Sequence, residues 1–452
     1  MPYTTPTAPA ASRTPSLLRR ELQDRLDTLA RTHRVPGAQL ALDTGTDVVA
    51  LHTGTADTAT GAPFTRDTAV PLGSLTKPYT AALVMLLADD GDLDPDEPAA
   101  AHLPELAGIP EVTIGHLLSH TGGLPTGPDS DTAAATTAAR YLAAVCTADA
   151  QLFPPGTDFS YSNAGYVAAG RLVEAVTGMP WHEAVAALLL EPLGTAPAFL
   201  GGSAHTRPAA AGHAVNTATG RPLPARQNLA PLEAPAGALL ASAVDLIAFG
   251  NALIGRSHVL PPAVAKDMRR PEPAARPGAL ADGWGLGVAL YRQADRVWCG
   301  HDGNAQGTSC HLRADPESGM VVAFTGNAAG ATALWRDLTD ELARLTGVRV
   351  PATAQDADRD RGRPVALPEC VGAYRNGTTV YCVAPGPDGS PALSVDGDLP
   401  LPLVCYADLA CDLRDPATGR LEPGGRFHRD PATGRIDRVQ ISGRTARRTD
   451  DG

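Results

Sequence analysis

A serine and a lysine three positions apart form the most reactive pair in the sequence. Ser74 precedes Lys77, and an apolar run follows over residues 81–87. On a helix, side chains three positions apart lie on one face, so the Lys77 amine lies within reach of the Ser74 hydroxyl. A serine hydroxyl is a weak nucleophile without an adjacent base, and an amine acts as that base only when it is neutral. We therefore expect Ser74 to be a nucleophile and Lys77 its base.

The rarity of lysine supports this interpretation. The chain contains two lysines, Lys77 and Lys266, and its other side chains that carry a permanent positive charge are arginines. Arginine stays protonated in proteins, whereas the pKa of lysine shifts readily on burial. A lysine at this position therefore favours a role that arginine cannot fill. The alternative is a solvated lysine that lies near a serine by chance.

A tyrosine and an asparagine lie between a Pro-Pro-Gly turn and an expected helix. Beside a lysine ammonium, Tyr161 can be held near its phenolate form and carry protons. The Asn163 amide can bond both Lys77 and a substrate amide. Taken alone, the pair is more typical of a core tyrosine followed by a helix-capping asparagine.

A third stretch, residues 300–304, reads Gly-His-Asp-Gly-Asn directly after an expected strand. The glycine Gly303 lets a substrate backbone lie along the strand as an added edge. The backbone N–H groups of Asn304 and Ser74 form a candidate oxyanion hole, in which one donor is worth about 3 kcal/mol to the transition state. As a lone motif, a glycine-rich hairpin with a surface histidine explains this stretch better.

Together, and in this order, the three motifs resemble those of the serine penicillin-binding-protein and class C β-lactamase family. The resemblance covers residues 15–346 and includes the stretches 116–125 and 235–245. It implies a nucleophile, an acid/base pair, and substrate and oxyanion contacts. By this resemblance Ser74 is the nucleophile, and Lys77 and Tyr161 are the acid/base pair. Asn163, His301 and Asn304 make the substrate and oxyanion contacts.

The third motif departs from the Lys-Thr-Gly of many β-lactamases, whose cation and hydroxyl recognise a substrate carboxylate. Here Asp302 follows His301. An aspartate near that position repels a carboxylate by a few kcal/mol at low effective dielectric. We therefore expect esters, thioesters or amides that lack a free carboxylate as substrates, and we include Asp302 and Gly303 among the substrate contacts. A further hypothesis is that Asp302 favours an amine nucleophile.

The elements that must position these residues follow from the spacing of apolar side chains. Leucines at helical spacing over residues 18–29 predict an amphipathic helix, and alternating runs predict antiparallel strands. We expect one sheet that joins the N-terminal hairpin to four late strands, with a helical lobe of about 71–280 inserted between them. The expected strands and later helices are 38–42, 48–51, 284–290, 296–299, 308–313, 320–325, 239–253 (helix) and 331–345 (helix).

These elements predict an α/β (α+β) β-lactamase-like catalytic domain, with an antiparallel sheet and a helical lobe, followed by a small all-β lipocalin-like barrel. The stretch Asp-Pro-Ala-Thr-Gly-Arg occurs at 415–420 and again at 430–435, which indicates successive hairpins of such a barrel. The expected boundaries are a flexible tail at 1–13, the catalytic domain at 14–350, a linker at 351–366 and the barrel at 367–452.

Composition excludes several classes of function. A net charge of −12 disfavours nucleic acid and anionic membranes as partners. No stretch approaches the roughly 18 apolar residues of a membrane span, and the first residues do not resemble a secretory signal. Seven scattered cysteines without a Cys-x-x-Cys pair argue against a zinc site or a disulfide framework. We therefore expect a reduced, cytoplasmic enzyme without a metal.

A cytoplasmic member with an added barrel resembles the penicillin-binding-protein-type thioesterases, which are stand-alone cyclases of nonribosomal peptides. The resemblance implies that Ser74 takes a peptidyl group from the thioester of a peptidyl carrier protein. The peptide's own N-terminal amine then releases it by head-to-tail macrolactamisation, with a D-residue at the acylating end and without an organic cofactor. We expect the barrel to exclude water and its arginine cluster of Arg444, Arg447 and Arg448 to reach substrate, and we assign the substrate contact to Arg447. A solvated run of terminal arginines is at least as good an explanation of this cluster.

Two other classes of function stay open. One is an esterase or a D-amino-acid-specific amidase or peptidase of the same family, which uses water as acceptor. The other is a non-catalytic binding protein, which a failure of Ser74 to react with a penicillin-like or fluorophosphonate probe would favour.

Overall fold

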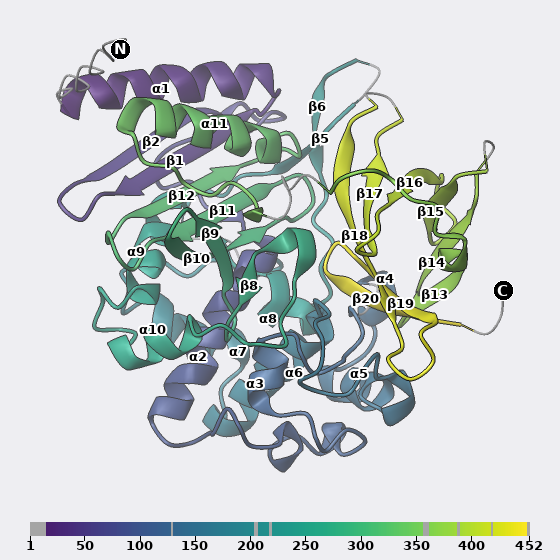
Figure 1. Ribbon diagram of the computed structural model, residues 1–452. Coiled ribbons are helices and arrows are strands. Elements are labelled where there is room, and N and C mark those ends of the chain that lie inside the picture. Colours follow the sequence, from purple (N-terminus) through teal and green to yellow (C-terminus); the bar gives the residue numbers. More distant parts are fainter. Residues whose placement is uncertain are drawn as a thin grey trace, which may run out of the picture.

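The structure is a computed structural model (Figure 1). It describes residues 15–127, 130–202, 207–216, 219–355, 361–386, 389–416 and 419–449. The expected tail at 1–13 and residues 356–360 of the expected linker lie outside the described residues.

An eight-stranded antiparallel sheet forms the centre of the larger part of the chain, with strand order β3-β2-β1-β12-β11-β10-β9-β8. Within it β1 pairs with β12, so that Leu40 lies opposite Phe324 on one side and Leu51 on the other. The predicted union of the N-terminal hairpin with the late strands is therefore confirmed. The strands are β1 Gly37–Asp43, β2 Val48–Asp57, β3 Ala62–Pro63, β8 Gly283–Trp284, β9 Ala289–Gln293, β10 Arg296–Gly303, β11 Ser309–Ala314 and β12 Val321–Gly326.

Two of the predicted elements are wrong in detail. The single strand expected at 284–290 is split into β8 and β9, because the chain turns at Gly287 with a φ of +87°. The helix expected at 239–253 begins only after Ser242, whose side chain caps it, and the residues before it form strand β7 Leu240–Ala241. That strand pairs with β4 Val70–Pro71, directly ahead of Ser74.

Helices cover both faces of the sheet (Figure 1). Helices α1 Pro15–Thr32 and α11 Ala331–Thr346 pack on each other over one face, and bury Leu22, Leu26, Leu334, Leu338 and Trp335 there. Helix α9 Ala243–Leu253 packs against β1, β11 and β12 from the other face. The strongly apolar pattern of β1 and β12, in which every residue is buried, follows from this double cover.

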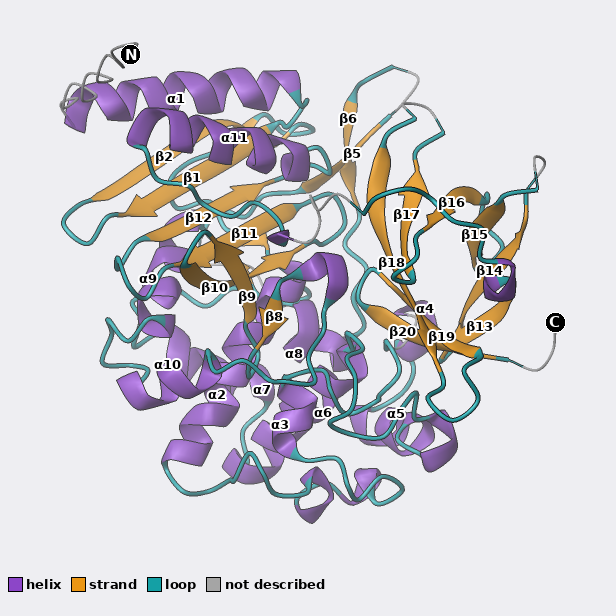
Figure 2. Cartoon of the chain, viewed as in Figure 1, coloured by secondary structure: helices purple, strands orange, loops and turns teal. Residues whose placement is uncertain are grey.

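The helical lobe lies below the sheet in Figure 2. Its central helix, α2 Lys77–Asp89, is buried almost all round, as its run of apolar residues requires. The other helices of the lobe are α3 Ile114–Leu118, α4 Ser130–Ala133, α5 Ala138–Val145, α6 Asn163–Thr177, α7 Trp181–Val185, a π-helical turn Ala186–Leu190, α8 Ala234–Gly237 and α10 Pro262–Met268. A small hairpin, β5 Gly212–Val215 and β6 Pro222–Ala225, leads towards the barrel side of the molecule.

The last strands close into an eight-stranded antiparallel barrel in which each strand pairs with the next and β13 pairs with β20. The two identical turns join β17 to β18 and β18 to β19, each closed by a 2.9 Å bond from its Asp N–H to its Arg carbonyl. The predicted barrel and its hairpins are confirmed. The strands are β13 Gly372–Asn376, β14 Thr379–Pro385, β15 Pro391–Val395, β16 Leu401–Cys405, β17 Ala410–Arg414, β18 Leu421–Arg429, β19 Ile436–Ile441 and β20 Arg444–Arg448.

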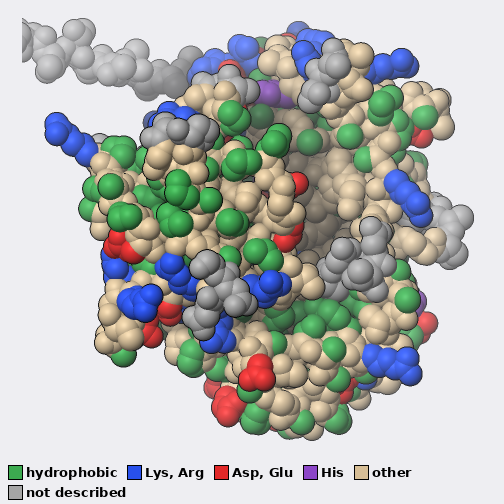
Figure 3. Space-filling model, turned by 90° about the vertical axis from the view of Figure 1, so that its right-hand side faces the viewer, with side chains coloured by type: hydrophobic (Ala, Val, Ile, Leu, Met, Phe, Trp, Pro, Cys, Tyr) green, Lys and Arg blue, Asp and Glu red, His purple; other side chains and the backbone are tan. Residues whose placement is uncertain are grey.

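The barrel is bonded directly to the segment that carries Tyr161. The Tyr161 N–H donates to the Gly443 carbonyl at 2.8 Å, and the Thr445 hydroxyl donates to the Phe159 carbonyl at 2.8 Å. Figure 3 shows the side of the molecule to which the barrel belongs, hollowed near its middle, with side chains of both charges scattered over it. All seven cysteines are free thiols. Within the described ranges, no helix has the length and apolar character to cross a bilayer.

Candidate active site

Ser74 lies in a single 3-10 turn, Gly73–Thr76, that leads directly into α2. Lys77 is the first residue of that helix and is only 1% exposed. Its Nζ lies 3.2 Å from the Ser74 Oγ and donates a second bond of 2.9 Å to the Ala236 carbonyl. The sequence-predicted pair is therefore in hydrogen-bond contact, with one helical turn between its members.

The surroundings of Lys77 favour a neutral amine. Burial lowers the pKa of Lys77 well below its ordinary value, the positive charge of Arg444 lowers it further, and Glu233 opposes the shift. A neutral amine 3.2 Å from a hydroxyl can take the proton of that hydroxyl. The geometry and the direction of the pKa shift agree on a base.

Tyr161 faces the same pair. The Lys77 Nζ lies 5.0 Å from the centroid of its ring, and the hydroxyl is buried without a full hydrogen bond to any described residue. Burial raises the pKa of Tyr161, although the nearby Ser74 and Arg444 oppose the shift. The expectation that a lysine ammonium holds this tyrosine near its phenolate form is therefore wrong, because desolvation outweighs the positive charges. Tyr161 is a phenol that can give a proton and take one back.

His120, which lies in the family-like stretch 116–125, supports this tyrosine. The His120 ring stacks on Tyr161 with centroids 4.4 Å apart and planes 30° apart. Its Nδ1 accepts a 3.0 Å bond from the Ser162 N–H, which fixes the ring on the Tyr161 motif. Burial lowers the pKa of His120 well below its ordinary value, so the stacked ring is neutral. His120 positions the tyrosine rather than contacting the reacting atoms.

Asn163 begins helix α6, which Ser162 caps through a 3.0 Å bond from the Gly165 N–H. Its side-chain Oδ1 is buried and lacks a hydrogen-bond partner among the described residues. Among the described residues, the Lys77 amine bonds the Ser74 hydroxyl and the Ala236 carbonyl, and not Asn163. Asn163 is therefore not the lysine partner that the sequence suggested, and its contact with substrate stays a prediction.

Two glycines bring the candidate oxyanion hole together. A Cβ at Gly73, which has a φ of +53°, would collide with the Asn304 carbonyl, and a Cβ at Gly303 would collide with the Leu72 carbonyl. The turn that carries Ser74 is thus in backbone contact with the end of β10. The two predicted donors, the amides of Ser74 and Asn304, belong to these touching segments.

His301 lines the same space and is 2% exposed. Its Nδ1 lies 2.5 Å from the Asp302 carbonyl, which places the ring proton on Nδ1, and its Nε2 has no partner in the described part of the chain. Burial lowers the pKa of His301 to about 3. The ring therefore offers a hydrogen-bond acceptor, where the lysine of the usual third motif offers a donor.

Asp302 does not act as the free negative charge that the sequence suggested. The Arg313 guanidinium holds both of its carboxylate oxygens, at 2.7 and 3.0 Å. Burial alone would raise the pKa of Asp302, but Arg313 and His311 outweigh it and hold the pKa well below its usual range. The Arg313 guanidinium offsets the negative charge of the Asp302 carboxylate. The argument that Asp302 repels a substrate carboxylate and attracts an amine therefore no longer holds.

A cavity of about 360 Å³ opens beside the nucleophile. Sequence reasoning identified several of its lining residues, Tyr161 among them, and missed the tryptophans, such as Trp284, which lies edge-on to His301 at 5.2 Å. The principal residues around it are Ser74, Tyr161, Trp284, His301, Asn304 and Arg444.

The arginine that reaches this cavity from the barrel is Arg444, not Arg447. The Arg444 guanidinium lies 5.3 Å from the centroid of the Tyr161 ring. Arg447 instead donates to the Gln151 carbonyl at 3.0 Å and lines a separate cavity. The correction has a simple cause: residues an odd number apart on a strand point to opposite faces. The sequence does not show which face of β20 each arginine occupies.

Replacing Arg444 with glutamine should shift the pH dependence of acylation to higher pH. Lys77 acts as a base only when neutral, and removing a positive neighbour favours its protonated form and raises its pKa. We expect several-fold slower labelling of Ser74 by a fluorophosphonate on the acidic side of the profile and an unchanged plateau at high pH. Arg447→Gln is the matched control, and an unshifted Arg444→Gln profile would contradict the assignment.

Comparison with known proteins agrees with this geometry. A family model described as Beta-lactamase matches residues 19–345. The chain belongs to the β-lactamase family. Penicillin-binding protein 4 of Amycolatopsis lactamdurans is 34% identical over 368 residues, which is 78% of this chain and 96% of that protein. Unguisins hydrolase ungD' of Aspergillus campestris is 26% identical over 407 residues, 81% of this chain and 72% of that protein.

Among solved structures of the β-lactamase family, a crystal structure of SurE is 35% identical, with a TM-score of 0.84, and covers 96% of this chain and 99% of its own. A structure of SurE with D-Leu gives a TM-score of 0.81. Because these matches span nearly the whole chain, the sheet domain and the barrel occur together in both proteins. As a β-lactamase family member with an intact site, the protein is a serine hydrolase or acyltransferase.

Proposed function

We propose that this enzyme is a peptide cyclase that takes a peptidyl group from the thioester of a peptidyl carrier protein and releases it as a head-to-tail macrolactam. The observation that carries the proposal is the match to SurE over both domains, in a protein whose structure has been solved with a D-amino acid. The D-Leu of that structure favours a D-residue in the substrate at the acylating end. The partner would be a carrier protein of a nonribosomal peptide synthetase in the cytoplasm.

Acylation follows from the positions of the side chains. Lys77 takes the proton of the Ser74 hydroxyl, and the Ser74 oxygen attacks the thioester carbonyl carbon. The amides of Ser74 and Asn304 hold the oxyanion, where such donors each contribute about 3 kcal/mol. The C–S bond then breaks, the carrier thiolate takes a proton from the Lys77–Tyr161 pair, and an ester of Ser74 remains.

Release forms an amide bond from this ester. The peptide's N-terminal amine attacks the ester carbonyl, the C–N bond forms, and the bond to the Ser74 oxygen breaks. The amine proton passes to Lys77 and Tyr161, which return a proton to Ser74. Holding amine and ester together is equivalent to an effective concentration of about 10⁵ M or more, so cyclisation outcompetes water only if the amine is well placed.

The second candidate is a hydrolase that acts on amide or ester bonds of D-residues or cyclic peptides. It is favoured by the relative named as an unguisins hydrolase and by a D-amino acid amidase structure with L-phenylalanine amide that is 25% identical over 73% of this chain. The site residues would be the same, with water in place of the amine.

Product masses from synthetic peptide thioesters separate these candidates. The panel pairs D- and L-residues at the acylating end with free and acetylated N-termini, and Ser74→Ala serves as the inactive control. We expect products one water lighter than the linear acid from D-terminal peptides with a free amine, and none of these from acetylated peptides.

The two other outcomes are equally informative. Linear acids alone from every thioester would replace the cyclase with the hydrolase. Absence of any product or acyl-enzyme from all thioesters, in a protein that still reacts with a fluorophosphonate, would reject carrier-bound thioesters as substrates.

A further inference from the structure

A fully buried arginine lies directly behind the catalytic cavity. Arg313 on β11 is 0% exposed, and all five of its N–H donors are used. Two bonds hold the oxygens of Asp302, at 2.7 and 3.0 Å, and a third, of 2.9 Å, goes to the carbonyl of Leu312. The last two go to the carbonyls of Pro351 at 2.9 Å and Ala352 at 3.1 Å.

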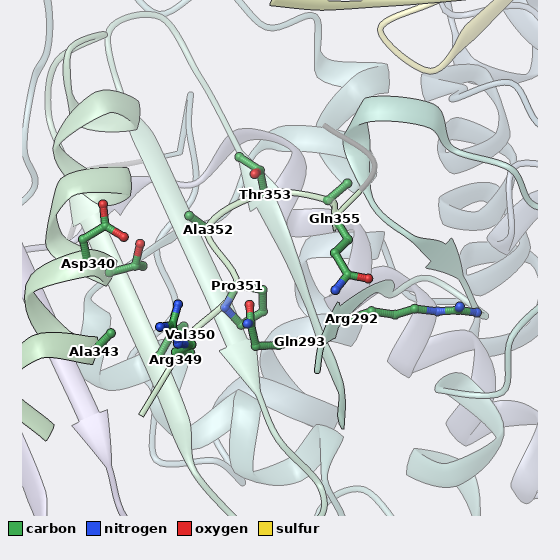
Figure 4. A pocket seen from close by; sticks show the side chains of 12 residues that line it. Arg292, Gln293, Asp340, Ala343, Arg349, Val350, Pro351, Ala352, Thr353 and Gln355 are labelled. Atoms are coloured by element: carbon green, nitrogen blue, oxygen red, sulfur yellow. The ribbon is translucent and has the colours of Figure 1, made fainter. Parts of the chain in front are cut away.

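These bonds join two separate walls of the cavity. Asp302 belongs to the end of β10, between His301 and the glycine that touches the Ser74 turn. Residues 351–353 belong to the segment that leaves α11 for the barrel, and Ala352 and Thr353 line the cavity beside Asp302. Figure 4 shows this segment between Asp340 of α11 and Gln293 of β9, and residues of all three line a second cavity of about 320 Å³.

Aromatic side chains hold the arginine in place. The Arg313 guanidinium lies 3.6 Å from the centroid of the Tyr291 ring, and the Tyr291 hydroxyl donates to Asp302 at 3.2 Å. His311 contacts Asp302 at 2.7 Å and stacks on Trp335, whose Nε1 donates to the Ala352 carbonyl at 3.3 Å. A network in which a fully buried arginine has every donor satisfied is rigid.

We propose that Arg313 is a positioning residue that fixes the spacing between the His301–Asn304 end of β10 and residues 351–353, and so orients the group that attacks the acyl-enzyme. The proposal rests on the proposed function, because an attacking peptide amine must be aligned within this space. Acylation by a small ester and attack by water need little alignment, since both reactants are small. If the end of β10 and residues 351–353 can move apart, the rate of aminolysis falls relative to the rate of hydrolysis. The chemical steps of both reactions stay the same.

The test uses Arg313→Lys, Arg313→Met, Asp302→Asn and the double variant of Arg313→Met with Asp302→Asn. We expect the cyclisation-to-hydrolysis ratio on a D-terminal peptide thioester to fall at least tenfold in each. Labelling of Ser74 by a fluorophosphonate should stay within about threefold of the parent in the two Arg313 single variants, because Arg313 lies behind the cavity wall and does not line the cavity. Lysine should not rescue the ratio, because it lacks the planar fork that holds carboxylate and carbonyls at once. The double variant should be no worse than its worse single variant, since both residues act through one contact.

A matched pair in the same sheet provides the control. Arg296 on β10 bonds the buried Asp315 at 2.8 Å, so Arg296→Met also removes an arginine from an aspartate. It should leave the ratio unchanged. An unchanged ratio in folded Arg313 and Asp302 variants would overturn the proposal, as would equal losses of labelling and cyclisation that follow thermal stability alone.

Two further measurements keep the test decisive. If the Arg313 variants do not fold, the cyclisation-to-hydrolysis ratio is measured in Asp302→Asn and in Trp335→Phe. The latter removes the second donor to the Ala352 carbonyl. If the parent enzyme forms no ring, the proposed function fails. The ratio is then measured as capture of a small acyl ester by added D-amino acid amide against water, and a tenfold fall in the variants still supports Arg313 as a positioning residue.

Discussion

Replacing Lys77 with methionine should slow acylation of Ser74 by roughly 10²–10⁴-fold, which is the range of a positioned base. Methionine keeps the length and apolar stem of lysine in a site that is 1% exposed, so the fold should persist with a modest loss of stability. The rate is measured as pseudo-first-order labelling of Ser74 by a fluorophosphonate, followed by intact mass.

Lys77→Arg distinguishes a base from a mere cation. Arginine cannot lose its proton in a protein, so a folded arginine variant should be as slow as the methionine variant. Lys266→Met, at the chain's other lysine on the exposed side of α10, is the matched control and should label at the parent rate. Labelling of Lys77→Arg within tenfold of the parent would show that charge, not proton transfer, is what the site needs from this residue.

The nucleophile and its base were predictable because their relation is local. Ser74 and Lys77 are joined by one helical turn, and spacing alone places such side chains on one face. The fold class was predictable for a related reason: the continuous apolar runs of α2 and β12 indicate buried elements, and the length of each run separates helix from strand. The amphipathic pattern of residues 18–29 likewise predicted the helix α1 with one apolar face.

The electrostatic role of Asp302 was not predictable, because it depends on strand register. Arg313 lies eleven positions later and reaches Asp302 only because β10 pairs with β11 so that Gly300 faces Arg313. A shift of one residue would turn the arginine to the other face. The same reasoning explains why Arg447 was chosen in place of Arg444, whose side of β20 the sequence does not show.

Contacts between the two domains were also outside the reach of the sequence. Nothing local in residues 443–445 indicates that they bond the Tyr161 segment, yet the Gly443 carbonyl accepts from the Tyr161 N–H at 2.8 Å. The barrel therefore supports the acid/base tyrosine by backbone contact as well as supplying Arg444 to the cavity. A sequence reading that treats the barrel only as a lid understates its part in the site.

Gly303→Ala should reduce acylation by at least about 10²-fold while leaving the protein folded. The added Cβ would meet the Leu72 carbonyl and lie 2.6 Å from the Leu75 amide nitrogen, and both are backbone atoms that cannot rotate away. Relief requires the Ser74 turn and the end of β10 to separate, which moves the Ser74 and Asn304 amides apart. Loss of a single oxyanion donor costs about 10²–10³ in kcat, and separation weakens both.

Gly283→Ala is the matched control for this substitution, since it adds a Cβ to a strand of the same sheet. There the nearest atoms would lie 3.7 Å away, at ordinary contact distance, so we expect labelling near the parent rate. Binding of a non-covalent substrate analogue separates a distorted oxyanion hole from a blocked cavity, because distortion lowers the acylation rate at unchanged affinity. A folded Gly303→Ala that labels within threefold of the parent would mean that these two amides do not stabilise the transition state, and the oxyanion hole would have to be sought elsewhere along β10.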